Sequence, residues 1–465
     1  MTAISFLVVC LAFLAGVVLA SLRTVGRTHM WPAVLLVVTA PLEVYRTKTG
    51  PFNLSLFRLA LVVALVVLAT DFLKGRLSGR RLPVVFAVYA LLVAWQALSL
   101  LAVSTQPSLG YRFLSQYAAG LLAAFVIARY VRRSDLMVVA VAYVASAILP
   151  LAASVFRVVS VRRHGSGDLP GLDLLPVDPA IRAARDTGSF LVSGVQRMQG
   201  TFSDPNHFGF FLATTFIIAL GLLGASMRSW APGDKHRTVS AGAMALACVV
   251  GVAGSYSRSA WLLTSVAVVV LFALIGRSVW TPRRALISAG CVVIVASLLA
   301  PAFVSRVNPR DRGTRTSNTE HARTMRRALE LAEDHPLTGV GLGSYGEHAG
   351  QPRLVSSAHS TVLTVAAELG LPGVFLLIVA ILLTAYGSIR SVLKRPAVAR
   401  PVGAGLAAAF IGLGIANFFY EVWMDDFQWV LFGLTIAALR PVEIPQRGSD
   451  TAVSTHPVPR PRALR

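Results

Sequence analysis

The sequence predicts an all-α protein that crosses a membrane 12 or 13 times. Of its 465 residues, 55% are hydrophobic and only 14% are charged, and the mean hydropathy is +0.67. This composition is too apolar for an ordinary soluble protein. Apolar runs close to the roughly 20 residues of a membrane span recur along the chain, and basic residues fill every second loop between them.

The runs at 30–43 and 427–439 are short, which leaves the number of spans at 12 or 13. The first run has no strong basic segment before it and no clear cleavage site after it, so we expect residues 4–20 to be a retained span rather than a signal peptide. The candidate spans lie near residues 3–20, 30–43, 54–73, 82–103, 111–128, 136–156, 206–227, 238–254, 260–276, 285–303, 360–386, 402–420 and 427–439.

The net charge of +22 would suggest nucleic acid as a partner of a soluble protein. In a membrane protein, basic residues kept on cytoplasmic loops explain it without a nucleic acid. We therefore expect residues 1–440 to form one transmembrane domain and 441–465, rich in Pro and Arg, to be a disordered cytoplasmic tail. The basic loops hold Lys74, Arg76, Arg80 and Arg81; Arg129, Arg132 and Arg133; Arg228, Lys235 and Arg237; Arg277, Arg283 and Arg284; and Arg390, Lys394, Arg395 and Arg400.

The other loops are then predicted to face outward, and functional residues are expected there. Two of these loops are long, 157–205 and 304–359, and two are short turns, 255–259 and the acidic 421–426. Long loops are exempt from the charge rule. The three cysteines, Cys10, Cys248 and Cys291, lie in apolar runs without metal-like spacing, so they are expected to be small buried hydrophobes.

Two outward segments carry unexplained arginines. In "RMQGTFSDPNHFGFFLA", Asp204 or Asn206 can cap the next helix, but capping does not account for Arg197. In "GSYSRSAWLL", Arg258 lies on a very short turn near the hydrocarbon boundary, where an arginine costs several kcal/mol unless it is paired or hydrated. A snorkelling interfacial arginine is the alternative for Arg258.

A third segment, residues 318–335, predicts an amphipathic helix on the outer surface. Proline after His335 should end it. The "GVGLGSYG" that follows lacks the lysine of a P-loop and faces the wrong compartment for ATP, so we reject a nucleotide site. The predicted apolar stripe holds Ala322, Met325, Leu329 and Ala332, and the polar side holds Arg323, Arg326, Arg327 and Glu330.

The fourth segment, "SSAHSTVLTVAAELGLPG", places His359 and Ser360 at the start of a span. Free N–H groups and the positive end of a helix favour anions at this position. A lone histidine is often merely interfacial, but arginines gather on the same face. Arg258, His359 and one arginine of the third segment, Arg323 or Arg326, together suggest a site for a multiply charged anion such as a lipid-linked pyrophosphate.

At these residues the chain resembles the O-antigen ligase and polymerase superfamily of bacterial polysaccharide enzymes. His359, Ser360, Gly370 and Gly373 meet its ligase-type pattern of His–Ser, nine residues, Gly, two residues, Gly. "DHPLTGVGLGSYG", "SRSAWLL" and "GTFSDPNHFGFFLA" are also similar to segments of the family. The resemblance covers roughly residues 195–385.

The resemblance implies functional roles for particular residues. The functional arginine of the short turn falls on Arg258, and the functional histidine on His359. The loop arginine falls on Arg323 or Arg326, because Met325 replaces the usual aromatic residue and leaves the register open. We take His359, Arg258 and Arg323 as catalytic, and expect substrate contacts from Arg326, Arg197, Asn206 and Ser360.

The implied reaction is glycosyl transfer without metal or cofactor on the outer face of the bacterial cell membrane. The donor would be a glycan on an undecaprenyl-type diphosphate, and the acceptor a hydroxyl of another glycan or lipid. The arginines would stabilise charge on the leaving diphosphate. His359 would act as general base or only hydrogen-bond donor or acceptor. A polymerase of the same superfamily, an anionic-lipid transporter and a non-catalytic scaffold remain alternatives.

Overall fold

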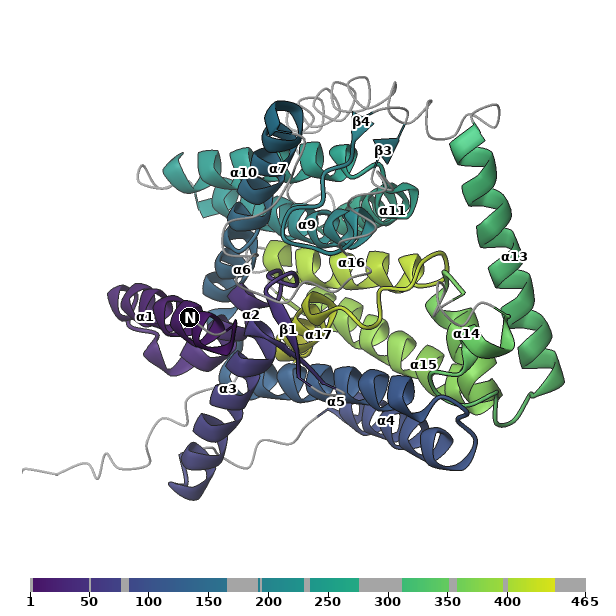
Figure 1. The fold of residues 1–465 in the computed structure, drawn as a ribbon. Helices are drawn as coiled ribbons and strands as arrows, with labels where there is room; N and C mark the ends of the chain where they lie inside the picture. Colours follow the sequence, from purple (N-terminus) through teal and green to yellow (C-terminus); the bar gives the residue numbers. More distant parts are fainter. Residues whose placement is uncertain are drawn as a thin grey trace, which may run out of the picture.

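The computed structural model (Figure 1) describes residues 3–49, 52–76, 83–164, 191–192, 195–229, 235–275, 312–350, 358–395 and 400–439. Within these residues, nine helices are long and apolar enough to cross a membrane. This confirms the predicted fold class, an all-α polytopic membrane protein. The predicted span at 285–303, Cys291 and the predicted tail lie outside the described residues.

The long helices follow the predicted apolar runs closely, and the run at 136–156 is divided between two consecutive helices. They are α1 (Ala3–Thr24), α3 (Leu56–Leu73), α4 (Val84–Ala102), α5 (Pro107–Tyr130), α6 (Leu136–Ala145) with α7 (Ile148–His164), α9 (Pro205–Ser229), α10 (Lys235–Gly254), α11 (Arg258–Ile275) and α15 (Thr361–Leu393).

Three shorter apolar helices correspond to the short or weaker runs. They are α2 (Trp31–Thr39), preceded by the 3-10 turn η1 (Thr28–Met30), α16 (Arg400–Ala416) and α17 (Asp426–Leu439). A second 3-10 turn, η2 (Arg133–Asp135), precedes α6. Two antiparallel hairpins complete the described fold: β1 (Arg46–Thr49) pairs with β2 (Phe52–Ser55), and β3 (Leu191–Val192) pairs with β4 (Val195–Gln196).

Glycine allows α9 and α16 to pack closely at the centre of the bundle. A Cβ on Gly221 would lie 2.7 Å from the carbonyl oxygen of Pro401 and 3.2 Å from the Cα of Gly405. Small residues at such a crossing are the usual solution inside membranes, where backbones must approach closely to gain packing energy. Most side chains of α16 are buried, so α16 forms part of the core around which the other helices pack.

The helices define two ends of the bundle. At the basic end, Arg395 donates from Nη2 to the carbonyl oxygen of Ala438 at 2.7 Å, which joins the ends of α15 and α17. At the opposite end, the N–H of Thr361 donates to the carbonyl oxygen of Asn417 at 2.9 Å, which joins the start of α15 to the end of α16. We call these the basic end and the polar end.

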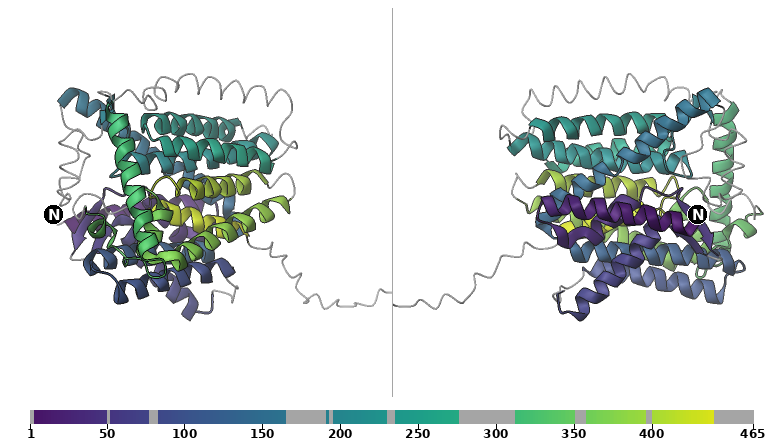
Figure 2. Two further views of the ribbon diagram at one scale, coloured as in Figure 1. Left: turned by 90° about the vertical axis from the view of Figure 1, so that its right-hand side faces the viewer. Right: turned by 60° about the vertical axis from the view of Figure 1, so that its left-hand side comes forward.

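Helix α13 (Arg312–Asp334) crosses the bundle instead of running along it (Figures 1 and 2). The predicted helix is therefore present and ends before Pro336, but the predicted apolar stripe is wrong. Ala328 and Leu331 are the buried apolar side chains of α13, whereas Leu329 is 50% exposed. The helix packs on Tyr345 of α14 (Tyr345–His348) and on the start of α15, and small side chains allow the close approach.

Helix α15 is kinked at Gly370, which has a φ of 66° and a ψ of −169°. The kink and Pro372 leave the carbonyl groups before it without their helical partners. The segment after α13 supplies new donors: the N–H of Val340 reaches the carbonyl of Ala367 at 2.8 Å, and the N–H of Gly341 reaches that of Glu368 at 3.0 Å. The glycine-rich "GVGLGSYG" is therefore a structural element that packs against the kink.

Candidate functional site

Helix α13 contacts the two residues that the sequence singled out most strongly, Arg258 and His359. Nη1 of Arg258, at the start of α11, donates to Oδ1 of Asn318 at 2.6 Å. One turn further along α13, the ring of His321 lies 4.2 Å from the ring of His359, centroid to centroid. Residues three apart on a helix are neighbours. The structure therefore brings Arg258 and His359 to adjacent positions on one face of α13.

His359 adopts a left-handed backbone conformation, with a φ of 53°. This conformation is uncommon outside glycine, although His, Asn and Asp adopt it more often than most residues. It ends the incoming segment directly before the helix. Ser360 then caps α15, because its hydroxyl accepts from the N–H of Leu363 at 3.3 Å. The turn and the cap hold the backbone of His359 at the start of α15.

Neighbours on two sides hold the start of α15. The hydroxyl of Thr361 donates to Oδ1 of Asn417 at 2.6 Å, and the N–H of Ala358 donates to the hydroxyl of Thr364 at 3.0 Å. His359 itself is half-buried. Burial lowers the pKa of His359 below its usual 6.5, although the distant charges of Asp204 and Glu320 oppose the shift. The ring is therefore neutral at pH 7 and can accept a proton.

A buried hydrogen-bond chain lies behind His359. Arg197 donates from Nε to the carbonyl of Ser255 at 2.7 Å and from Nη2 to Oδ1 of Asn206 at 2.8 Å. Asn206 in turn donates from Nδ2 to the hydroxyl oxygen of Tyr420 at 3.0 Å, and the ring of Tyr420 lies 6.0 Å from that of His359. Arg197 is only 7% exposed. This chain links the short turn before α11 to the wall of the site.

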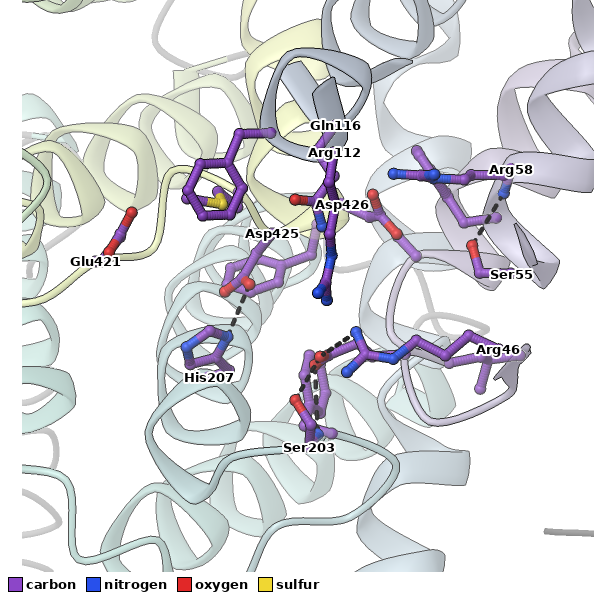
Figure 3. A pocket seen from close by; sticks show the side chains of 18 of the residues that line it. Arg46, Ser55, Arg58, Arg112, Gln116, Ser203, His207, Glu421, Asp425 and Asp426 are labelled. Atoms are coloured by element: carbon purple, nitrogen blue, oxygen red, sulfur yellow. Dashed lines mark hydrogen bonds and ion pairs between the residues drawn. The ribbon is translucent and has the colours of Figure 1, made fainter. Parts of the chain in front are cut away.

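His359 and Tyr420 both line a cavity of about 480 Å³, and Figure 3 shows polar residues of its wall. The cavity is lined by three arginines, Arg46, Arg58 and Arg112, and by four carboxylates, Glu43, Glu421, Asp425 and Asp426.

Two ion pairs bring opposite charges together in the cavity wall. Arg46 pairs with Glu43 at 3.2 Å, and Nδ1 of His207 lies 2.7 Å from Oδ1 of Asp425. Phenylalanine and tyrosine rings complete the wall. The cavity is thus polar and rich in both donors and acceptors, but it carries no large excess of either charge.

The remaining predicted site residues take other positions. Arg323 and Arg326 are exposed, on the side of α13 away from His321, and Nε of Arg326 lies 3.2 Å from Oε1 of Glu330. Ser360 is 1% exposed and acts as the helix cap. Asn206 and Arg197 bond to each other, as described above.

Sequence reasoning missed a second group of residues. Asn318 and His321 of α13 face Arg258 and His359, and the cavity arginines come from the hairpin, α3 and α5. For the pair on α13, a signal existed: polar residues three apart on the helix, one of them a histidine. The cavity arginines lie in the N-terminal third of the chain, outside every motif.

The kink at Gly370 gives a stability prediction. A Cβ at this position would lie 2.7 Å from the carbonyl carbon of Leu337, and its backbone lies in a region that only glycine adopts readily. We expect Gly370→Ala to lower the free energy of unfolding by about 1–3 kcal/mol or more. Thermal unfolding of the purified protein in detergent measures it.

Gly242→Ala is the matched control for Gly370→Ala. No atom lies within 4 Å of a Cβ at Gly242, in the helical backbone of α10. Because alanine is favoured over glycine in helices, this variant should melt at or slightly above the wild-type temperature. Equal melting of the two variants would contradict the role assigned to the kink.

One region of the chain is similar to a known protein family. Residues 243–378 match a family model described as O-antigen ligase. The match holds Arg258, His359, the kink at Gly370 and the exposed arginines of α13, and it begins after Arg197. No curated protein matches the chain.

Proposed function

We propose that this chain is a membrane glycosyltransferase of the O-antigen ligase superfamily, to whose family model residues 243–378 are similar, and that it transfers a glycan from a polyprenyl diphosphate to an acceptor hydroxyl beside His359. The active site would lie at the polar end, on the outer face of a bacterial cell membrane. The observation that carries the proposal is the position of His359. Its ring lies 4.2 Å, centroid to centroid, from that of His321 on α13, and His359 also lines the polar cavity.

The donor diphosphate would bind on the α13 side, at Arg258. A guanidinium stays charged at any working pH and makes two parallel hydrogen bonds to a phosphate. Arg258 is half-buried, and lower dielectric strengthens such bonds. Arg323 and Arg326, exposed on α13, would attract the anionic donor over longer range.

The acceptor sugar would enter the cavity. Sugar hydroxyls both donate and accept hydrogen bonds, so the mixture of arginines and carboxylates there suits them. A diphosphate would instead meet the four carboxylates of the cavity, so the charge pattern favours placing the donor's diphosphate outside it. In this proposal the charged diphosphate of the donor binds at Arg258, the uncharged acceptor binds in the cavity, and His359 adjoins both.

The reaction follows from this arrangement. The acceptor oxygen attacks the anomeric carbon of the donor sugar while the bond from that carbon to the diphosphate oxygen breaks. His359 accepts the proton of the attacking hydroxyl. Arg258 stabilises the negative charge that grows on the leaving diphosphate. The products are the new glycosidic bond and the polyprenyl diphosphate.

A polymerase would use the same donor and site. Incubating the purified protein with a lipid-diphosphate glycan and candidate acceptors tests both versions. A single addition to a different acceptor supports a ligase, and a ladder of repeat units supports a polymerase. A transporter would move the lipid across vesicle membranes without forming any glycosidic product, and that outcome would reject glycosyl transfer.

We expect transfer to survive chelation. In the part of the chain that the structure describes, no three His, Cys, Asp or Glu residues are grouped so that they could hold a metal ion, and the proposed chemistry uses arginine and histidine. Transfer should therefore proceed at an unchanged rate in excess EDTA. Loss of activity that Mg²⁺ or Mn²⁺ restores would reveal a metal-dependent step.

A further inference from the structure

A second cavity lies at the basic end of the bundle, between α1, α3 and α5. Its volume is about 910 Å³. Along α5, Arg112 lines the first cavity and Arg129 lines the second. A helix rises about 1.5 Å per residue, so these two positions lie about 26 Å apart along the axis. The second cavity is therefore separate from the proposed active site.

The wall of this cavity is strongly cationic. Five basic side chains and one carboxylate line it: Arg23, Lys74, Arg76, Arg129, Arg132 and Asp71. Two groups occupy the carboxylate: the hydroxyl of Tyr130 donates to Asp71 at 2.9 Å, and Arg76 approaches it at 3.6 Å. Asp71 therefore offsets only part of the positive charge.

A second carboxylate near the cavity, that of Asp135, already has basic partners. Asp135 is fully buried and pairs with Arg27 at 2.6 Å and with His29 at 3.2 Å. The backbone N–H of Arg132 also donates to Asp135, at 3.1 Å. These bonds hold the segment before α6 in place beneath the cavity. The side chains of Arg23, Lys74 and Arg132 remain exposed around the opening.

The rest of the wall is mixed, with Thr28, His29, Thr70 and Tyr130 beside three apolar side chains. Leu19, Trp31 and Val67 line the cavity beside the basic groups, and exposed apolar side chains continue from it along the helices. Val66 on α3 is 61% exposed and Val17 on α1 is 48% exposed. A ligand that filled the whole site would thus present a phosphate to the arginines and a hydrocarbon chain to the helix faces.

We propose that this cavity binds the phosphate-bearing headgroup of an anionic membrane lipid, from the leaflet at the basic end. Basic pockets between membrane helices bind such headgroups on the cytoplasmic side, where the charge of the surrounding loops places this end. Several guanidinium groups around one opening can hold a phosphate through parallel charge-assisted hydrogen bonds. The apolar side chains of the wall favour a lipid over free phosphate.

The test compares two triple variants of the full chain. Arg23→Gln/Lys74→Gln/Arg132→Gln removes three exposed charges from the cavity. The loop variant, Arg237→Gln/Arg390→Gln/Lys394→Gln, removes three exposed charges outside the cavity, from the helix ends that border two of the predicted basic loops. Both lose the same net charge. Thermal unfolding in detergent identifies any variant that fails to fold.

The readout is the dissociation constant of phosphatidylglycerol from detergent-solubilised protein, measured by native mass spectrometry against phosphatidylcholine with the same acyl chains. We expect the cavity variant to bind phosphatidylglycerol about tenfold more weakly or worse, and the loop variant to bind like wild type. Equal weakening in both variants, or no preference over phosphatidylcholine, would overturn the proposal. Displacement of the lipid by millimolar inorganic phosphate would reassign the cavity to free phosphate.

Discussion

Replacing His359 with alanine should lower glycosyl transfer by about 10²–10⁴-fold, the usual contribution of a general base. Binding of the lipid donor should change little, because the diphosphate is assigned to Arg258. Turnover and donor affinity, measured side by side on the purified variant, separate the two effects. If the variant loses binding and turnover together, His359 is a ligand of the donor. If turnover stays near normal, His359 is an interfacial residue.

The control for this variant concerns the backbone. The φ of 53° at His359 is costly for alanine and better tolerated by asparagine. His359→Asn therefore keeps the turn before α15 and removes the base. Both variants should lose turnover, and His359→Asn should melt close to wild type. Recovery of activity in the asparagine variant would show that the turn, rather than the imidazole, is what transfer requires.

The pH dependence of the wild-type enzyme follows from the same assignment. Burial lowers the pKa of His359 below 6.5, so the neutral, proton-accepting form predominates at pH 7. Transfer should therefore be level through neutral pH and fall only as the pH drops through that lowered pKa. The acid limb should be absent from the small residual activity of His359→Asn.

Composition and periodicity predicted the membrane fold because spans must be long and apolar whatever their neighbours. The periodicity of a span is fixed within a short stretch of chain, so it could be predicted from the sequence. Gly370 appeared in the sequence only as part of a family resemblance. The reason for a glycine there, a backbone conformation and an approach to Leu337 that leave no room for a Cβ, appears only in the folded structure.

The buried face of α13 could not be read in the same way. Periodicity favoured Met325 and Leu329, but packing against Tyr345 selected Ala328 instead. A small residue permits two elements to approach closely, and the hydrophobicity of the residues alone does not predict this. The polar cavity shows the same limit, because Arg46, Arg58 and Arg112 meet only after helices and a hairpin from separate parts of the chain pack together.

Replacing Arg258 with lysine should lower transfer by about 10²–10³-fold, the loss seen when one donor to a developing negative charge is removed. The charge is conserved, but an ammonium group cannot make the planar two-bond contact with a phosphate. The hydrogen bond from the guanidinium to Oδ1 of Asn318, 2.6 Å long in the wild type, would also be lost, because a lysine side chain is shorter. Turnover and donor affinity should both fall, in contrast to His359→Asn.

Arg390→Lys supplies the matched control, since Arg390 is exposed on α15 toward the basic end and should transfer glycan at the wild-type rate. Asn318→Ala distinguishes two roles of Arg258: binding the diphosphate and holding α13 in place. It removes the partner of Arg258 but leaves the guanidinium, so its loss should be smaller than that of Arg258→Lys if the guanidinium itself binds the diphosphate. Were Asn318→Ala as inactive as Arg258→Lys, Arg258 would act by holding α13 in place, and the diphosphate would need another ligand.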